Sequence, residues 1–347
     1  MSTTGSGQRA YIGSFTSAGG RGIITAAVDA ETGALTPLHA TDEVPDPSYL
    51  APAPDGRHLY AVSETSDGAA AAFALTEEGP VPLGAPIPVG GAAPTHLTLW
   101  SGHLLTANYT SGSVSALPIR ADGRLAGPAA VLQHEGSGPH PDRQEGPHAH
   151  AVLPDPTGRW LLSVDLGTDS VRVCELDPVS GKPAVRDEVR LRPGSGPRHL
   201  AFHPRGDHAY VINELASTAT PCRWEAATGT LTPLTETPVL PPEADGNYPS
   251  ELVVSHDGRF AWAANRGHDS ISVLAIEASG AGFSLVTTVP CGGHWPRDLT
   301  LHPGGRHLYA ANERSGDVTW FAIDARTGVP EAGGSIEAPA ASCVVFV

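Results

Sequence analysis

One phrase recurs along this chain: a proline, a short apolar strand, a turn rich in proline, aspartate and glycine, and a second strand that ends in a polar residue. Successive copies begin 47, 53, 50, 52 and 47 residues apart. The prolines that head them are Pro47, Pro94, Pro147, Pro197, Pro249 and Pro296, and the copy at Pro94 is degenerate. A repeat of roughly 40 to 50 residues made of short strands is typical of a β-propeller blade. The sequence therefore predicts a ring of blades, with almost no place for helix.

Each unit is expected to hold four antiparallel strands, a to d, from the central channel to the rim. In the last full unit, strands a, b and c are predicted at 298–302, 307–312 and 317–323. Residues 10–38 match strands b, c and d but lack a strand a, whereas the segment from Pro339 matches strand a and then stops. We therefore predict an all-β, seven-bladed propeller, closed by a C-terminal inner strand that joins three N-terminal strands. Residues 1–9 are expected to be a flexible tail, and residues 10–347 a single domain.

Composition excludes several classes of function. The formal net charge of −16 argues against nucleic acid or an anionic membrane as a partner, because both require a basic face. The four cysteines stand alone, without the spacing of a disulfide framework or a zinc site, and are expected to be reduced. There is no 18-residue apolar stretch and no apolar segment near the start, so we expect a cytoplasmic protein that is a monomer or weak homodimer.

Catalytic motifs with a fixed local pattern are missing. The chain has no GxSxG elbow, no P-loop, no GxGxxG after a strand and no HExxH. A serine nucleophile, nucleotide chemistry and a zincin are therefore unsupported. We expect neither a cofactor nor a metal ion.

Two positions of the repeat differ from copy to copy, as functional positions in a repeat protein do. They are the residue after the proline and the second residue of the polar pair that ends strand b. In or beside these columns, neighbouring units carry His148, His150, Arg198, Glu214, Arg266 and Arg297. Guanidinium groups match oxyanions bidentately, so the set predicts a site for a phosphate or carboxylate at one mouth of the channel. The alternative is an ion-pair lattice that only rigidifies the mouth.

The first residue of the same polar pair is Ser, Asn or Asp in every copy. A short polar side chain at this position is typical of a cap on turn backbone. This framework role is expected for Asn108, Asn213, Asn265 and Asn312.

Residues 134–150 lengthen one unit and gather histidine, arginine and glutamate. Segments that interrupt a repeat often carry function. The spacing His148-x-His150 permits a zinc site, but without a placed third ligand this interpretation is weak. Alternation along a strand places both histidines on one face without any metal.

Long motifs of the chain resemble those of the seven-bladed lactonase family. They are YIGSFTSAGGRGI at 11–23, RQEGPHAH at 143–150, GPRHLAFHP at 196–204, YPSELVVSHDGRF at 248–260 and ANRGHDSI at 264–271. The resemblance covers nearly the whole chain. It implies a propeller enzyme whose relatives include a hydrolase that opens a sugar lactone and a cyclase that closes a dicarboxylate onto an alkene.

The resemblance also implies the site. From the cyclase, the catalytic set is His148, Arg198, Glu214 and Arg266, and all four residue types are retained. The expected substrate-binding residues are His150, Arg297, Glu251, Asn265 and Arg143. One departure is Glu313, where many relatives have Gln, and it adds negative charge at the mouth.

The leading hypothesis from the sequence is hydrolysis of a sugar lactone, most plausibly 6-phosphogluconolactone, with a small anionic lactone or carboxylate as the only partner. His148 would act as a base toward water, and arginines would stabilise the oxyanion. A cyclase or lyase acting on a carboxylate substrate would use the same groups. A propeller that binds a small molecule without turnover is the third interpretation.

Overall fold

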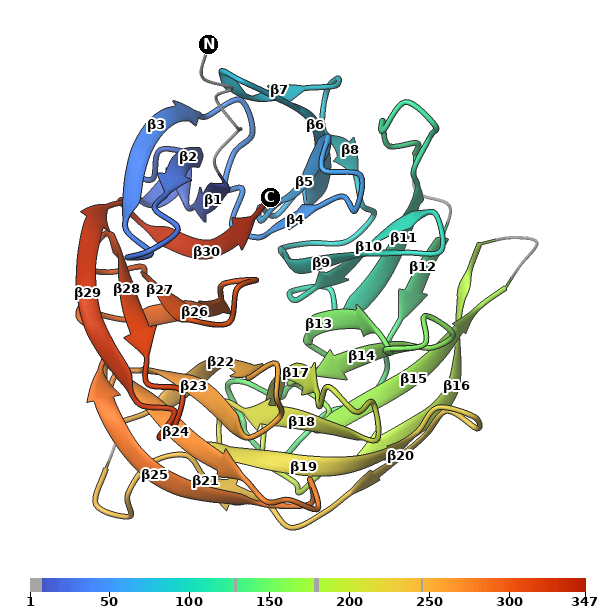
Figure 1. Ribbon diagram of the computed structural model, residues 1–347. Helices are drawn as coiled ribbons and strands as arrows, with labels where there is room; N and C mark the ends of the chain where they lie inside the picture. Colours follow the sequence, from blue (N-terminus) through green and yellow to red (C-terminus); the bar gives the residue numbers. More distant parts are fainter. Residues whose placement is uncertain (1–7, 128–129, 178–180, 245) are drawn as a thin grey trace.

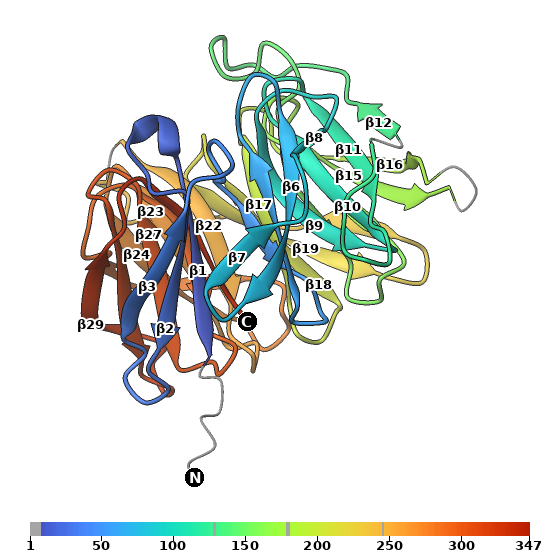
Figure 2. The ribbon, with the colours of Figure 1, turned by 90° about the horizontal axis from the view of Figure 1, so that it is seen from above.

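The structure is a computed structural model that describes residues 8–127, 130–177, 181–244 and 246–347. Most of the tail expected at residues 1–9 lies outside these ranges, and Arg9 already belongs to the first strand. Seven antiparallel sheets stand around a central axis in chain order (Figure 1). The view from above shows the twist of the sheets from the axis to the rim (Figure 2). The predicted seven-bladed propeller is confirmed.

Blades 1 to 6 each begin at one of the repeated prolines. Blade 1 holds β4 (Leu50–Pro52), β5 (His58–Ser63), β6 (Ala69–Thr76), β7 (Gly79–Pro82) and β8 (Ile87–Pro88). Blade 2 holds β9 (Pro94–Trp100), β10 (His103–Asn108), β11 (Ser113–Pro118) and β12 (Ala130–Gln133). Blade 3 holds β13 (Ala149–Pro154), β14 (Leu161–Asp165), β15 (Ser170–Leu176) and β16 (Pro183–Arg190).

Blades 4 to 6 follow the same plan. Blade 4 holds β17 (Pro197–Phe202), β18 (His208–Asn213), β19 (Thr218–Glu225), β20 (Thr230–Pro233) and β21 (Thr237–Pro238). Blade 5 holds β22 (Tyr248–Val254), β23 (Phe260–Arg266), β24 (Ser270–Ile276) and β25 (Phe283–Pro290). Blade 6 holds β26 (Pro296–Leu301), β27 (His307–Asn312), β28 (Asp317–Ile323) and β29 (Pro330–Glu337).

Blade 7 is shared by the two ends of the chain. It holds β1 (Arg9–Ser14), β2 (Ile23–Val28), β3 (Leu35–Thr41) and β30 (Ala341–Phe346). The C-terminal strand β30 is innermost and pairs antiparallel with β1, with Tyr11 opposite Val345 and Ile12 opposite Val344. A single 3₁₀ turn, η1 (Thr16–Ala18), follows β1. The predicted closure is confirmed, and it leaves no inner strand without a partner.

The core consists of apolar layers between neighbouring blades, and polar tips of buried aromatic residues tie these layers together. Tyr60 of blade 1 donates to the Gly123 carbonyl of blade 2 at 2.9 Å. Tyr309 of blade 6 donates to Gly33 of blade 7 at 2.6 Å. Because each phenol reaches a turn of the next blade, the spacing between blades is fixed around the ring.

The asparagines that end strand b have a framework role, but their partners differ from the expected turn backbone. Asn108 donates to the hydroxyls of Ser113 and Ser115, at 3.1 and 2.8 Å. Asn213 donates to two threonine hydroxyls of β19 in the same way. These amides therefore fasten strand b to strand c through side chains, because the hydroxyls of strand c face them across the sheet.

All four cysteines are buried and free. Among the described residues, no helix is long and apolar enough to cross a membrane.

Candidate active site

A carboxylate surrounded by three arginines lies at the end of the channel where strands a begin and strands b end. Glu214 follows β18, and Arg266 ends β23 of the next blade. Arg266 Nη2 donates to Glu214 Oε2 at 2.6 Å, and Arg198 Nε lies 3.2 Å from the same oxygen. Arg143 Nη2 donates to the other oxygen, Oε1, at 2.6 Å. The structure thus brings four predicted residues together, and Arg143, which was expected to bind substrate, is a direct partner of Glu214.

The charges in this cluster are strongly coupled. Burial alone would raise the pKa of Glu214, but Arg266, Arg198 and Arg143 outweigh burial and lower this pKa to about 2. Burial and the neighbouring Arg266 lower the pKa of Arg198 to about 9, which leaves its guanidinium protonated at neutral pH. Glu214 is therefore a permanent anion that holds arginines in place and is not a proton donor.

Two guanidinium nitrogens of this cluster make none of the contacts with Glu214 or with backbone carbonyls. Arg266 also uses Nε, which donates to the Tyr248 carbonyl at 3.0 Å, and Arg198 uses Nη1, which donates to the Ser250 carbonyl. Among the described residues, Arg266 Nη1 and Arg198 Nη2 have no hydrogen-bond acceptor, and neither is sealed from solvent. Two free guanidinium nitrogens are therefore available for a substrate oxygen.

His148 lies beside this cluster, just before β13, and is held by Tyr109. The two rings stack with centroids 4.5 Å apart and planes inclined by 17°. His148 Nδ1 lies 3.0 Å from the Tyr109 carbonyl oxygen, which can only accept, so Nδ1 carries the hydrogen. The other ring nitrogen, His148 Nε2, lies 3.2 Å from Glu145 Oε1. The phenol of Tyr109 accepts a hydrogen bond from Arg143 Nη2 at 3.2 Å, which connects His148 to the arginine cluster.

Buried polar residues fix the position of the 134–150 segment. Asp165 Oδ1 accepts from the His148 backbone N–H at 2.9 Å, and its Oδ2 contacts His134 Nδ1 at 2.6 Å. Gln144 is fully buried and donates to Leu166 O and to Asp169 Oδ1, at 2.8 and 2.7 Å. His134, the first residue of this segment, is therefore part of the framework that places His148.

Arg297 is neutralised by two glutamates. Its Nη1 donates to Glu313 Oε2 at 3.1 Å, and its Nη2 lies 3.5 Å from Glu64 Oε1. The guanidinium also lies over the Phe15 ring, 4.7 Å from its centroid. Glu313 thus forms an ion pair with Arg297. Because two carboxylates already compensate the charge of Arg297, this arginine attracts an anionic substrate only weakly.

His150 lies one layer deeper, with His199 beneath it. Their ring centroids are 5.3 Å apart, and the His150 ring is 5.6 Å from that of Tyr109. Burial first, and then the charge of Arg198, lower the pKa of His150 well below its usual value. His150 is therefore neutral, and its Nδ1 has no partner among the described residues.

Glu251 lines a small cavity together with Arg198 and is not a partner of Glu214. One of its oxygens contacts His199 Nδ1, and the other accepts from the Leu252 N–H at 3.0 Å. The backbone register shifts between Pro249 and Leu252, the stretch that carries this side chain. Asn265 is fully buried and donates to Ser270 and Ser272, like its counterparts in other blades. Among the described residues, neither side chain forms a hydrogen bond or ion pair with Glu214.

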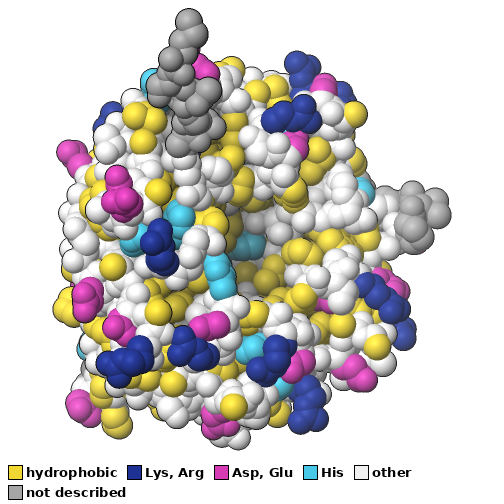
Figure 3. All heavy atoms as spheres, in the orientation of Figure 1, with side chains coloured by type: hydrophobic (Ala, Val, Ile, Leu, Met, Phe, Trp, Pro, Cys, Tyr) yellow, Lys and Arg dark blue, Asp and Glu magenta, His cyan; other side chains and the backbone are white. Residues whose placement is uncertain are grey.

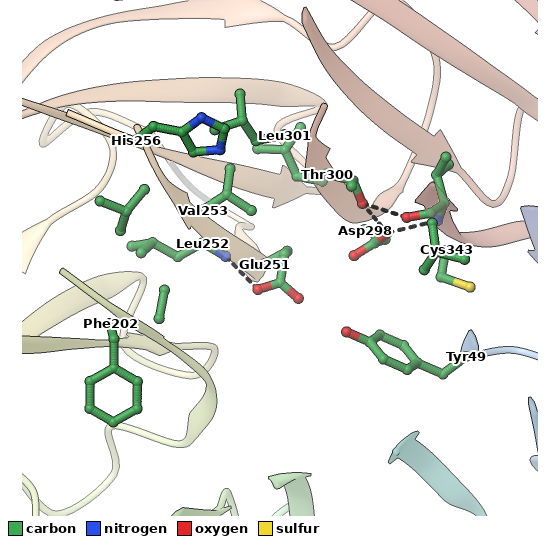
Figure 4. Close-up of a pocket in the computed structure, with 15 residues that line it drawn as sticks. Tyr49, Phe202, Glu251, Leu252, Val253, His256, Asp298, Thr300, Leu301 and Cys343 are labelled. Atoms are coloured by element: carbon green, nitrogen blue, oxygen red, sulfur yellow. Dashed lines mark hydrogen bonds between the residues drawn. The ribbon is translucent and has the colours of Figure 1, made fainter. Parts of the chain in front are cut away.

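Toward the other end of the channel there is a chamber of about 380 Å³, which shares Tyr49, Glu251 and Asp298 with the small cavity beside Arg198. The face of the ring in Figure 1 is hollowed at its centre and lined mostly by apolar side chains (Figure 3). Inside this chamber the carboxyl groups of Glu251 and Asp298 and the hydroxyl of Tyr49 point toward one another (Figure 4). Burial raises the pKa of Glu251 to about 8 and that of Asp298 to about 7. At neutral pH Glu251 is thus mostly protonated, and Asp298 is protonated in part.

Among the residues that the structure describes, no three His, Cys, Asp or Glu side chains are placed to hold one metal ion. His148 and His150 both lie against Tyr109, and a carbonyl oxygen occupies Nδ1 of His148.

Sequence reasoning missed Tyr109, Glu145 and Glu64 as members of the mouth. Tyr109 and Glu64 stand in the variable column after strand b, so their position in the repeat was the available signal. Glu145 gives no such signal, because the segment that carries it does not follow the repeat.

The fold and the site define a seven-bladed propeller enzyme with a histidine beside carboxylate-anchored arginines. Comparisons with known proteins agree. The model of the family described as "Lactonase, 7-bladed beta-propeller" matches residues 9–346. The chain belongs to this family.

Several named relatives share about 30% sequence identity with the chain. A 6-phosphogluconolactonase of Bacillus subtilis is 32% identical over 271 residues, which is 77% of each chain. A 6-phosphogluconolactonase of Formosa agariphila is 30% identical over 81% of this chain and 82% of its own. The solved structure of a periplasmic gluconolactonase of Pseudomonas aeruginosa superposes with a TM-score of 0.92 at 30% identity, over 98% of this chain and 99% of that one.

Proposed function

We propose that this protein hydrolyses a six-carbon sugar lactone, with 6-phosphogluconolactone as the leading substrate. The observation that carries the proposal is the pair of free guanidinium nitrogens, Arg266 Nη1 and Arg198 Nη2, held by Glu214 beside His148. The names of the 6-phosphogluconolactonases and the gluconolactonase that this chain resembles support the same class of substrate.

In the proposed reaction, His148 Nε2 removes a proton from a water molecule as the water oxygen bonds to the lactone carbonyl carbon. Tyr109 O and Glu145 then stabilise the imidazolium that forms, because Nδ1–H donates to the carbonyl and Nε2–H faces the carboxylate. The protonated histidine returns its proton to the ring oxygen when the bond between carbonyl carbon and ring oxygen breaks. The product is a hydroxy acid, which ionises in solution.

The arginines stabilise the oxyanion of the tetrahedral intermediate. In a site that excludes water, a fixed donor aimed at a developing negative charge contributes about 3 kcal/mol to the rate. Arg266 and Arg198 cost no reorganisation, because Glu214 and two backbone carbonyls already hold them. Arg143 is 34% exposed at its side chain, so it is placed to contact the part of the substrate nearer to solvent.

The direct test measures lactone hydrolysis by the purified protein above the spontaneous rate, with glucono-1,5-lactone and its 6-phosphate as substrates. His148→Ala and Arg266→Ala should each lower kcat/KM by about a hundredfold or more. The control Arg57→Ala removes an arginine whose side chain is 79% exposed, and it should leave the rate unchanged.

Three outcomes would contradict the proposal. Absence of enzymatic hydrolysis of either lactone would overturn the function, and unchanged activity in both variants would overturn the site. Turnover of a carboxymuconate in place of a lactone would favour a cyclase.

A further inference from the structure

At two positions of the repeat, the residue type in blade 5 or 6 differs from that in the other blades. The residue before each repeated proline is Asp46, Ala93, Gly146 or Gly196 in blades 1 to 4, but Tyr248 and Trp295 in blades 5 and 6. The residue that follows the polar pair at the end of strand b is Thr16, Thr65, Thr110, Gly167, Leu215 or Gly267, but Arg314 in blade 6. Two aromatic residues and an arginine therefore replace small or uncharged residues, all in adjacent blades beside Arg266.

Trp295 occupies a backbone conformation that suits glycine. Its φ is 65°, close to the 61° of Gly196 at the equivalent position. A bulky side chain in the left-handed region is strained, and such strain persists where the surrounding structure enforces it. Here the Trp295 N–H donates to Asp269 Oδ1 at 2.8 Å, and its carbonyl accepts from the Glu313 N–H at 3.1 Å. Glycine would satisfy this backbone conformation without strain, so the backbone does not require the indole of Trp295.

The indole supports Arg314 near the arginine cluster. The Arg314 guanidinium carbon lies 3.4 Å from the Trp295 ring centroid, and that of Arg266 lies 5.7 Å from the same centroid. The Tyr248 ring, 40% exposed, is 6.1 Å from Trp295. A guanidinium stacked on an aromatic face keeps its N–H edge free for a bidentate contact. Both guanidinium groups thus lie over the same indole, with Arg314 closer to the ring than Arg266.

Arg314 also differs from the other arginines near the mouth because no carboxylate among the described residues forms an ion pair with it. Arg143, Arg198 and Arg266 share Glu214, and Arg297 is paired with Glu64 and Glu313. Within the described ranges, Arg314 has no carboxylate within ion-pair distance and is exposed. Its positive charge is therefore available to a ligand.

We propose that Arg314, supported by Trp295, binds the phosphate group of a phosphorylated sugar lactone whose carbonyl lies at Arg266 and His148. This inference rests on the proposed function and deepens it, since it assigns the residues that select a phosphorylated substrate over a neutral one. Tyr248 borders the same subsite. Arg297 does not serve this purpose, because two glutamates compensate its charge.

The experiment compares glucono-1,5-lactone with its 6-phosphate in the wild type, Arg314→Gln, Trp295→Gly and the control Arg57→Gln. A lost charge-assisted contact is expected to raise KM for the phosphorylated lactone about ten- to a hundredfold in Arg314→Gln, with kcat nearly unchanged. KM for the neutral lactone should stay the same. Trp295→Gly should act in the same direction, because its backbone conformation is one that glycine adopts without strain.

Equal effects of Arg314→Gln on both lactones, or no effect on either, would overturn the inference. A wild type that hydrolyses neither lactone would instead overturn the proposed function. In that case titration calorimetry with 6-phosphogluconate and gluconate tests the subsite independently. Weaker binding of 6-phosphogluconate alone to Arg314→Gln is expected, and equal binding to wild type and variant, or no binding to wild type, would refute the subsite.

Discussion

Glu214 and Arg266, which are 52 residues apart in the chain, meet across the interface between blades 4 and 5 with 2.6 Å between Oε2 and Nη2. The contact is buried and repeated on the other carboxylate oxygen by Arg143. A single side chain thus joins two blades and the 134–150 segment. Stability and catalysis should respond together when it is changed.

Replacing Glu214 by Gln should therefore lower both quantities. Loss of one partner from a buried charge network destabilises a protein by about 3 to 5 kcal/mol, since the remaining charges are left uncompensated. We expect a lower Tm at pH 7 and a fall in kcat/KM of at least about a hundredfold. Thermal melts and lactone hydrolysis measure the two effects. A variant with wild-type Tm and wild-type rate would contradict the role of Glu214.

The same carboxylate predicts the acid limit of stability. The pKa of Glu214 falls from 4.5 to about 2 on folding, so its contribution is present above pH 4.5 and is lost as the pH falls toward 2. The wild type should lose Tm over this window more steeply than Glu214→Gln does. Parallel melts between pH 6 and 2 provide the comparison. Identical slopes would show that Glu214 is not stabilised as an anion by the fold.

Glu251 predicts the opposite dependence at higher pH. Burial raises its pKa from 4.5 to about 8, so the fold favours the protonated carboxyl, and stability is lost as the pH rises from 4.5 through 8. Glu251→Gln keeps the shape and removes the ionisation, and its Tm should decline less than that of the wild type between pH 6 and 9. A wild type and variant with parallel melting curves across this range would show that Glu251 does not ionise with a raised pKa.

Tyr109 offers a graded test of how His148 is held. Tyr109→Phe keeps the ring that stacks on His148 and removes the hydroxyl that accepts from Arg143. Tyr109→Ala removes both. Because an aromatic pair contributes about 0.5 to 1.5 kcal/mol, we expect kcat/KM to fall about tenfold in Tyr109→Ala and about threefold or less in Tyr109→Phe. Equal losses in the two variants would assign the effect to the hydroxyl and not to the stack.

The repeat was sufficient to predict the fold because it fixes strand boundaries through turns and alternation. β27 and β28 begin and end at the predicted residues, and only β26 starts two residues early, at Pro296. Pro296 pairs with Asn312 before the register shifts, so the strand continues through an irregularity that the alternation of apolar residues does not reveal.

The candidate site could be predicted only where it follows the repeat. Arg198 follows the repeated proline of blade 4, and Glu214 and Arg266 occupy equivalent positions after strand b in blades 4 and 5, so their approach to one another follows from the ring. The contact between Arg143 and Glu214 could not be predicted from the repeat, because the 134–150 segment has no counterpart in other units. Glu251 was expected to bind substrate, but one of its oxygens contacts His199 and, among the described residues, it forms no ion pair with the arginines around Glu214.

The closure of the ring gives the most direct test of the architecture. Deleting residues 342–347 removes most of β30, whose Cys343 and Val344 are buried and whose backbone pairs with β1. The inner edge of β1 would then be unpaired, and the layers against β4 and β26 would lose apolar contacts. We expect Tm to fall by more than about 10 °C, or folding to fail, because several kcal/mol of buried contact are lost. Removing Val347 alone, which is 36% exposed, is the matched control and should shift Tm by only a few degrees. If the longer deletion melted like the control, the C-terminal strand would not be what closes the ring.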